Sequence, residues 1–201
     1  NTISKKLNFK QQKSNLEEWN KYINIIQNDT KPKLEIALVG KYTSLSDSYL
    51  SVSEAINHAA AANFCDTKIT YINSEKLNGS NIESSLKNFK GILIPGGFGD
   101  RGIEGKIEAA KYARENNIPF LGLCLGMHIA IIEFARNILK LESAHSTEFN
   151  QNTDYPVIDF LPQQRQIHQK GGTMRLGSYP CIVEKNTNLF NAYKTEKINE
   201  R

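Results

Sequence analysis

Short apolar segments alternate with longer amphipathic ones over most of the chain. The apolar segments are short enough for single buried strands, and the segments between them carry apolar residues at helical spacing. Strands are predicted at 34–39, 68–72, 91–94 and 118–123, and helices at 47–62, 82–86, 103–116 and 127–139. This alternation predicts an α/β fold with a doubly wound, mainly parallel sheet. Ligands of such sheets bind at the carboxyl ends of the strands.

The N-terminal part departs from this alternation. Residues Ser14 and Glu17 fit a capping box, and the apolar residues that follow predict an amphipathic helix over 15–28 that requires a surface to cover. We therefore interpret 1–31 as an interdomain linker with an amphipathic helix, and 32–201 as the main domain.

The C-terminal part also changes character after the last predicted helix. Segments 157–161 and 172–183 have extended patterns separated by glycines. They predict a C-terminal hairpin beside the main sheet, and a further helix begins near 188–193.

Charge and cysteine content narrow the class of protein. The formal net charge is +4, and the first 33 residues carry it, with seven lysines and three acidic residues. No aromatic and basic patch accompanies these lysines, so nucleic acid is not an expected partner. The longest apolar run contains Cys124 and is interrupted by His128 and Glu133, and the N-terminus is polar; neither a membrane span nor a signal peptide is expected. Cys65, Cys124 and Cys181 are widely spaced without a metal-ligand pattern, which indicates a reducing, cytoplasmic compartment.

A cysteine flanked by glycines follows the strand predicted at 118–123. Gly122, Cys124 and Gly126 stand where an apolar strand passes into a helix, which is the pattern of a nucleophile elbow with cysteine as the nucleophile. The glycines leave room for a tight backbone path, and the helix N-terminus favours a thiolate. The alternative is a small, buried, apolar cysteine at a strand end.

A glycine-rich segment at 95–102 follows the neighbouring strand predicted at 91–94. By itself it is compatible with an ordinary loop between a strand and a helix. Beside a cysteine elbow it predicts an oxyanion hole, in which the backbone N–H groups of Gly97 and Leu125 donate to the developing negative charge.

Five segments, taken together and in order, resemble the class I (triad) glutamine amidotransferases, and in particular the glutaminase domain of the CTP synthase family. They are Ala-Leu-Val-Gly-Lys-Tyr at 37–42, the glycine-rich segment at 95–105, Leu-Gly-Leu-Cys-Leu-Gly-Met at 121–127, Ser-Thr-Glu-Phe at 146–149 and Gly-Gly-Thr-Met-Arg-Leu-Gly at 171–177. The resemblance covers nearly the whole chain and implies the flavodoxin-like fold of that family. The helix at 15–28 resembles the segment that joins the family's synthetase and glutaminase domains.

The resemblance implies a role for each matching residue. Cys124 would attack the side-chain amide of L-glutamine, form a γ-glutamyl thioester and release ammonia. Gly97 and Leu125 would stabilise the oxyanion, and Glu148 would bind the α-amino group of the substrate. The substrate contacts implied in this way are Gly97, Leu125, Gly126, Met127, His128 and Glu148.

Two features depart from the family pattern. His128 stands where the family usually has a glutamine that contacts the substrate, so we expect a substrate-contact variant. A cysteine nucleophile also needs a histidine base and an acidic residue that orients it, and the family supplies both from a His-x-Glu pair downstream of 171–177. No such pair follows in this sequence, so we expect the domain at 32–201 to be truncated at its C-terminus. The other histidines are interpreted as surface residues: His58, His145 and His168.

The resemblance implies no metal or organic cofactor for the glutaminase step. ATP, Mg²⁺ and UTP would belong to the synthetase domain of the same enzyme, which is absent from this sequence, and the full-length enzyme is expected to be a homo-oligomer that makes CTP. The alternative function is a non-catalytic or redox-sensing DJ-1/PfpI-like module, in which Cys124 is a redox or binding site. A His-x-Glu pair beyond Arg201 would favour the amidotransferase.

Overall fold

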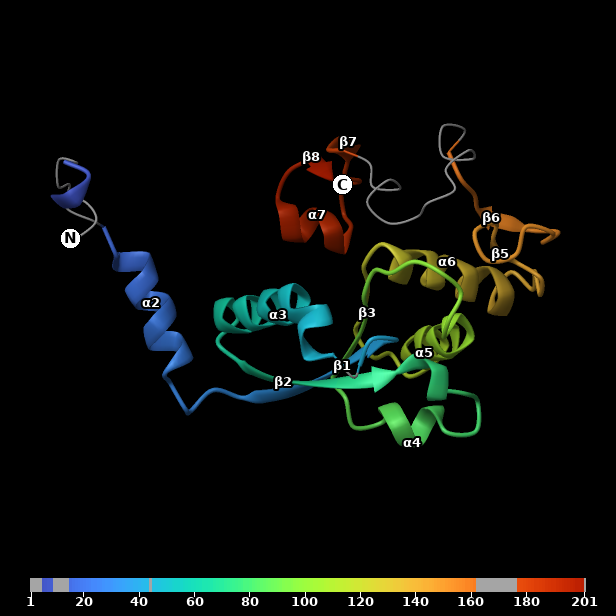
Figure 1. Cartoon of the computed structure of the whole chain (residues 1–201), viewed down its shortest axis with the longest axis horizontal. Helices are drawn as coiled ribbons and strands as arrows, with labels where there is room; N and C mark the ends of the chain where they lie inside the picture. The colour runs from blue at the N-terminus through green and yellow to red at the C-terminus, as the bar shows by residue number, and fades with distance from the viewer. Residues whose placement is uncertain (1–4, 9–14, 44, 162–176, 201) are drawn as a thin grey trace.

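The computed structural model describes residues 5–8, 15–43, 45–161 and 177–200. Its central sheet consists of β1 (Lys33–Gly40), β2 (Asp66–Asn73), β3 (Gly91–Ile94) and β4 (Phe120–Gly122). The strands are parallel and lie in the order β2-β1-β3-β4; the first three are labelled in Figure 1. The chain therefore reverses its direction of winding between β1 and β3, the position at which open α/β sheets bind ligands. The predicted parallel α/β sheet is confirmed.

Helices cover both faces of this sheet because successive side chains of each strand point to opposite sides. Ala37 and Val39 of β1 pack into the larger apolar core, which α5 (Ile103–Glu115) and α6 (Leu125–Asn137) complete. Leu38 faces the other way and packs against Tyr49 and the first turns of α3 (Leu50–Ala62). Two short elements follow β2: the 3₁₀ turn η2 (Ser74–Lys76) and α4 (Ile82–Leu86). Within the described residues, no helix combines the length and the apolar character needed to cross a bilayer.

The N-terminal helix differs from its prediction at both ends. It is α2 (Glu17–Ile26), and its N-cap is Leu16 without a side-chain cap, whereas the proposed cap Ser14 lies outside the described residues. The side chain of Asn15, the residue before this N-cap, accepts a hydrogen bond from the backbone N–H of Glu17 at 3.1 Å. No residue of α2 is buried, and Figure 1 shows the helix extending away from the sheet. Its apolar stripe therefore remains largely uncovered in this chain.

The C-terminal region contains the predicted antiparallel pair, but with different strands. β7 (Tyr179–Ile182) pairs with β8 (Lys197–Glu200), and α7 (Asn188–Tyr193) lies between them in the chain. The segment predicted at 157–161 contributes β6 (Pro156–Ile158), which instead pairs in parallel with the short β5 (His145–Ser146). β8 gave no strand signal because only one of its four residues is apolar. The glycine-rich part of 172–183, up to residue 176, lies outside the described residues.

Candidate active site

Cys124 lies between the end of β4 and the start of α6, at the N-cap position of the helix. Its backbone dihedrals are φ 52° and ψ −106°, a conformation that L-residues rarely adopt and that is typically retained at functional sites. The side chain is exposed. The elbow geometry predicted from the sequence is therefore present, and the alternative of a buried apolar cysteine is wrong.

Two glycines make this turn possible. A Cβ atom on Gly126 would lie 2.2 Å from the carbonyl oxygen of Ile94, and a Cβ atom on Gly122 would lie 2.3 Å from the carbonyl carbon of Gly126. Because both neighbours are backbone atoms, no side-chain rotation relieves these contacts. Close packing of α6 against β3 and β4 thus requires glycine at both positions, as the elbow motif predicted.

The glycine-rich loop after β3 lies against the elbow. A Cβ atom on Gly96 would lie 3.4 Å from Cβ of Cys124, and one on Gly97 would lie 3.8 Å from Cδ2 of Leu125. The structure therefore brings together the proposed nucleophile and the two residues predicted to form the oxyanion hole.

Glu148 approaches the same loop from a different part of the chain. It follows β5, and its backbone N–H donates to Oγ of Ser146 at 3.2 Å. Its Oε1 accepts a hydrogen bond from the backbone N–H of Gly99 at 3.4 Å. The carboxylate predicted to bind the substrate's amino group is thus within reach of the loop that contains Gly97.

His128 lies one turn into α6, and its backbone N–H donates to the carbonyl oxygen of Cys124 at 3.2 Å. Its Nδ1 is buried and has no hydrogen-bond partner among the described residues. Burial lowers the pKa of the imidazole below its usual value, while the nearby Glu148 carboxylate acts in the opposite direction. The neutral imidazole is therefore favoured, with one donor and one acceptor nitrogen. Gly126 and Met127, the two residues before His128 that are also predicted to contact the substrate, differ in exposure: Gly126 is buried and Met127 is 50% exposed.

Two buried lysines behind the glycine-rich loop were not identified from the sequence. Lys41 follows β1 and is 9% exposed, and its ammonium group donates to the carbonyl oxygen of Phe98. Lys106 in α5 is 2% exposed, and burial, followed by repulsion from Lys41, lowers its pKa to about 8. Lys41 lies in the segment 37–42 that resembles the family and directly follows a predicted strand. Since ligands bind at the carboxyl ends of such strands, this position could have identified Lys41 as a residue near the site.

The remaining candidates lie elsewhere. Cys65 is half-buried beside Ala60, and Cys181 lies in β7. The ring of His58 packs against Tyr22 with centroids 5.6 Å apart. The fourth histidine, His168, and the matched residues 171–176 are outside the described residues.

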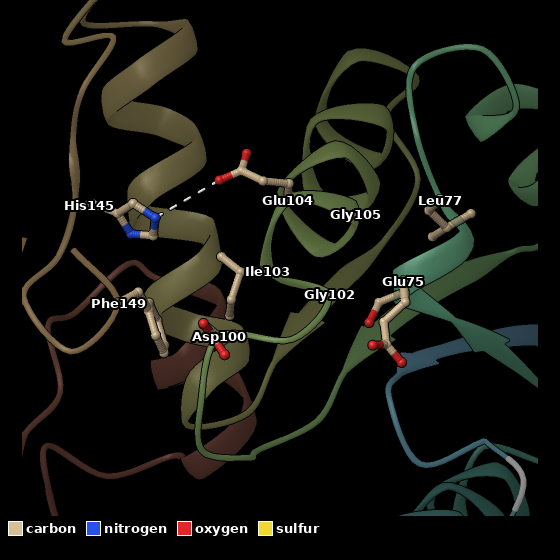
Figure 2. A pocket seen from close by; sticks show the side chains of 10 residues that line it. Glu75, Leu77, Asp100, Gly102, Ile103, Glu104, Gly105, His145 and Phe149 are labelled. Atoms are coloured by element: carbon tan, nitrogen blue, oxygen red, sulfur yellow. Dashed lines mark ion pairs between the residues drawn. The ribbon is translucent and has the colours of Figure 1, made fainter.

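A cavity of about 480 Å³ lies near this site but does not include Cys124. Figure 2 shows that the N-terminal turn of α5, η2 and the region of His145 and Phe149 surround it. His145 Nε2 lies 3.9 Å from Oε1 of Glu104, and burial lowers the pKa of this histidine, which weakens the pair. None of the predicted substrate contacts lines this cavity, so we do not assign it to the substrate.

Comparisons with known proteins agree with this arrangement. The family model described as glutamine amidotransferase class-I matches residues 44–199. The CTP synthase of Caldanaerobacter subterraneus subsp. tengcongensis is 52% identical over 199 residues, which are 99% of this chain and 37% of that protein. The CTP synthase of Methanocaldococcus jannaschii is 49% identical over 205 residues, covering 99% of this chain and 38% of that protein.

A solved structure, the glutaminase domain of Trypanosoma brucei CTPS with bound acivicin, superimposes with a TM-score of 0.73 and 36% sequence identity. The match covers 84% of this chain and 65% of that one. This chain spans only 37% of the first curated relative, so it corresponds to one part of those enzymes. These matches favour the amidotransferase over the DJ-1/PfpI-like alternative. The chain belongs to the class I glutamine amidotransferase family, and within that family it matches the glutaminase domains of CTP synthases.

Proposed function

We propose that this domain hydrolyses L-glutamine through a thioester on Cys124. The thiolate adds to the side-chain carboxamide, the tetrahedral intermediate collapses with loss of ammonia, and water then releases glutamate and the free thiol. Backbone N–H groups of Gly97 and Leu125 stabilise the oxyanion in both steps. The observation that carries the proposal is the positive φ of 52° at Cys124, in a strand-to-helix elbow that packs against the glycine-rich loop.

The proposed substrate contacts surround this nucleophile. Glu148 binds the α-ammonium group of glutamine, because a half-buried carboxylate beside the loop provides the complementary charge. Gly126, Met127 and His128 line the approach to the thiol from the first turn of α6. The structural neighbour from Trypanosoma brucei is a glutaminase domain with bound acivicin, which supports a small-molecule site in this fold.

In the whole enzyme we propose that the ammonia serves an ATP-dependent amination of UTP to CTP. The synthetase domain would perform that reaction with ATP and Mg²⁺, and the glutaminase step itself uses no cofactor. We also propose that residues 1–31 connect the two domains and that the complete cytoplasmic enzyme is a homo-oligomer. These proposals rest on the CTP synthases whose sequences match this chain.

An electrophilic analogue of glutamine, such as a diazoketone, is expected to label Cys124 alone. The elbow exposes this thiol at a helix N-terminus, whereas Cys65 is half-buried and Cys181 lies in the C-terminal hairpin. Peptide mass spectrometry after labelling checks the site, with Cys124→Ser as the matched control. Label distributed over all three cysteines, or absent from Cys124, would contradict the proposed function.

His128→Gln is expected to leave kcat nearly unchanged and to alter KM, in a protein whose base is complete. The substitution restores the residue type usual in the family and exchanges a neutral imidazole for an amide with two donors and one acceptor. A contact made equally in the ground and transition states affects mainly KM. Steady-state kinetics across glutamine concentrations measure both constants. A loss of kcat beyond about a hundredfold at constant KM would instead make His128 the base.

A further inference from the structure

One peptide bond in the glycine-rich loop is held from both of its polar ends. The carbonyl oxygen of Phe98 accepts a hydrogen bond from the ammonium group of Lys41. The N–H of the same peptide group, on Gly99, donates to Oε1 of Glu148 at 3.4 Å. The Lys41 ammonium group and the Glu148 carboxylate, more than a hundred residues apart in the chain, therefore bind opposite ends of the Phe98–Gly99 peptide group. The positive charge lies at the carbonyl end of the peptide dipole and the negative charge at the N–H end.

Lys41 is itself firmly placed. Its backbone N–H and that of Tyr42 donate to the hydroxyl oxygen of Tyr49 at 3.1 and 3.2 Å. The residue is 9% exposed, and its Cε atom would lie 3.9 Å from a Cβ atom on Gly97. A buried ammonium group is costly unless it is hydrogen-bonded. The Phe98 carbonyl therefore becomes a required partner, and the loop is tied to the end of β1.

The loop needs such an external restraint. Gly96, Gly97 and Gly99 lack the Cβ atom that limits backbone freedom, and Gly99 has φ +79°. An oxyanion donor contributes to catalysis only when it is held close to its productive position before the charge develops. Gly97 stands two residues before Gly99, so fixing the Phe98–Gly99 peptide also limits the orientation of the Gly97 N–H.

We propose that Lys41 is a positioning residue for the oxyanion hole, acting through the Phe98 carbonyl, and that Glu148 completes this clamp from the opposite side. This inference rests on the proposed function, in which Glu148 also binds the substrate's α-ammonium group. Glu148 then contacts both the substrate and the peptide group that orients the oxyanion donor. In this proposal Lys41 acts through the Phe98 carbonyl and not by direct contact with the substrate or the sulfur.

The test compares Lys41→Met with Lys41→Arg and with Lys87→Met, a control at an exposed lysine on the C-terminal end of α4. In the chain continued through a His-x-Glu pair, Lys41→Met is expected to lower kcat by about 10- to 100-fold, with a smaller change in KM. In the chain as it stands, the rate of Cys124 labelling by the diazoketone should fall in parallel. Lys41→Arg, which keeps a cation and its donors, should recover part of the lost kcat, and Lys87→Met should change nothing.

A double variant tests whether Lys41 and Glu148 act through one peptide. The effects of Lys41→Met and Glu148→Gln on kcat should be less than additive, because either change releases the same group. Circular dichroism establishes that each variant is folded, and Lys41→Gln replaces Lys41→Met if the latter is unfolded. A wild-type kcat in Lys41→Met, or strictly additive effects, would overturn the clamp. If the parent protein neither releases ammonia nor labels at Cys124, the proposed function fails instead, so the two failures are distinguishable.

Discussion

Ammonia release from glutamine is expected to rise by about 10²–10⁴-fold when this chain is continued through a His-x-Glu pair of the kind found in its family. The reason is that the thiol of Cys124 must lose its proton before it can attack. A cysteine that attacks an amide needs a base nearby, and the departing ammonia then needs a proton from the same group.

The described part of this chain does not provide such a base. Within it, no side chain is hydrogen-bonded to Sγ of Cys124. His128 is in the same helix, but its buried Nδ1 has no hydrogen-bond partner among the described residues, so it lacks the acidic residue that orients the histidine of a triad. His58 and His145 are engaged with Tyr22 and Glu104. Residual activity of the chain alone is therefore expected to come from the oxyanion donors and from substrate binding.

A coupled glutamate dehydrogenase assay measures this difference at saturating glutamine. The matched control is the continued chain with the added histidine changed to alanine, which should return to the low rate while retaining Cys124 labelling. If the chain with and without the continuation releases ammonia equally fast, another residue supplies the base. Neither form is expected to produce CTP, because the proposal assigns the ATP and UTP sites to the synthetase domain.

The sequence was sufficient for the sheet and the elbow because both depend on local patterns. The central strands β1 and β3 contain apolar runs that are buried on both faces of the sheet, and this burial selects their composition. The edge strands β2 and β4 are less buried, and shorter apolar segments were enough to predict them. Gly122 and Gly126 flank Cys124 within a short distance along the chain, which made the motif recognisable. The steric reason is local for Gly122, which contacts Gly126, but for Gly126 it is the carbonyl group of Ile94 in β3. These residues predicted a tight turn at Cys124, and the structure adds that Cys124 itself has a positive φ of 52°.

The features that the sequence did not reveal depend on contacts between distant segments. The Lys41 ammonium group and the Glu148 carboxylate meet at one peptide only after β1, β3 and the segment after β5 have been brought to the same end of the fold. Burial of Lys106 likewise depends on how α5 packs, because a lysine in a helix is otherwise expected to face solvent. The pairing of β7 with β8 has the same origin, since a polar strand is selected by its partner and not by its own apolar pattern.

Gly126→Ala is expected to lower the free energy of unfolding by about 3 kcal/mol and to abolish rapid labelling of Cys124. In an ordinary helix the same change stabilises by roughly 0.5–1 kcal/mol, because glycine has the larger conformational entropy to lose. Here the added methyl group would lie 2.2 Å from the carbonyl oxygen of Ile94 and 3.2 Å from its Cβ atom. Both atoms belong to or directly adjoin the backbone of β3, so α6 must move away from the sheet. That movement displaces the elbow, and steric cost therefore outweighs helix propensity.

Urea unfolding monitored by circular dichroism measures the stability change, and the rate of diazoketone labelling reports the elbow. The matched control is Gly79→Ala, since a Cβ atom at Gly79 meets nothing within 4 Å and should leave both quantities close to their original values. Gly122→Ala should behave like Gly126→Ala, because its Cβ atom would lie 2.3 Å from the Gly126 carbonyl group. An unchanged urea midpoint in Gly126→Ala would show that α6 is not packed against β3 as closely as the structure indicates. The reactivity of Cys124 would then have to be explained without the elbow.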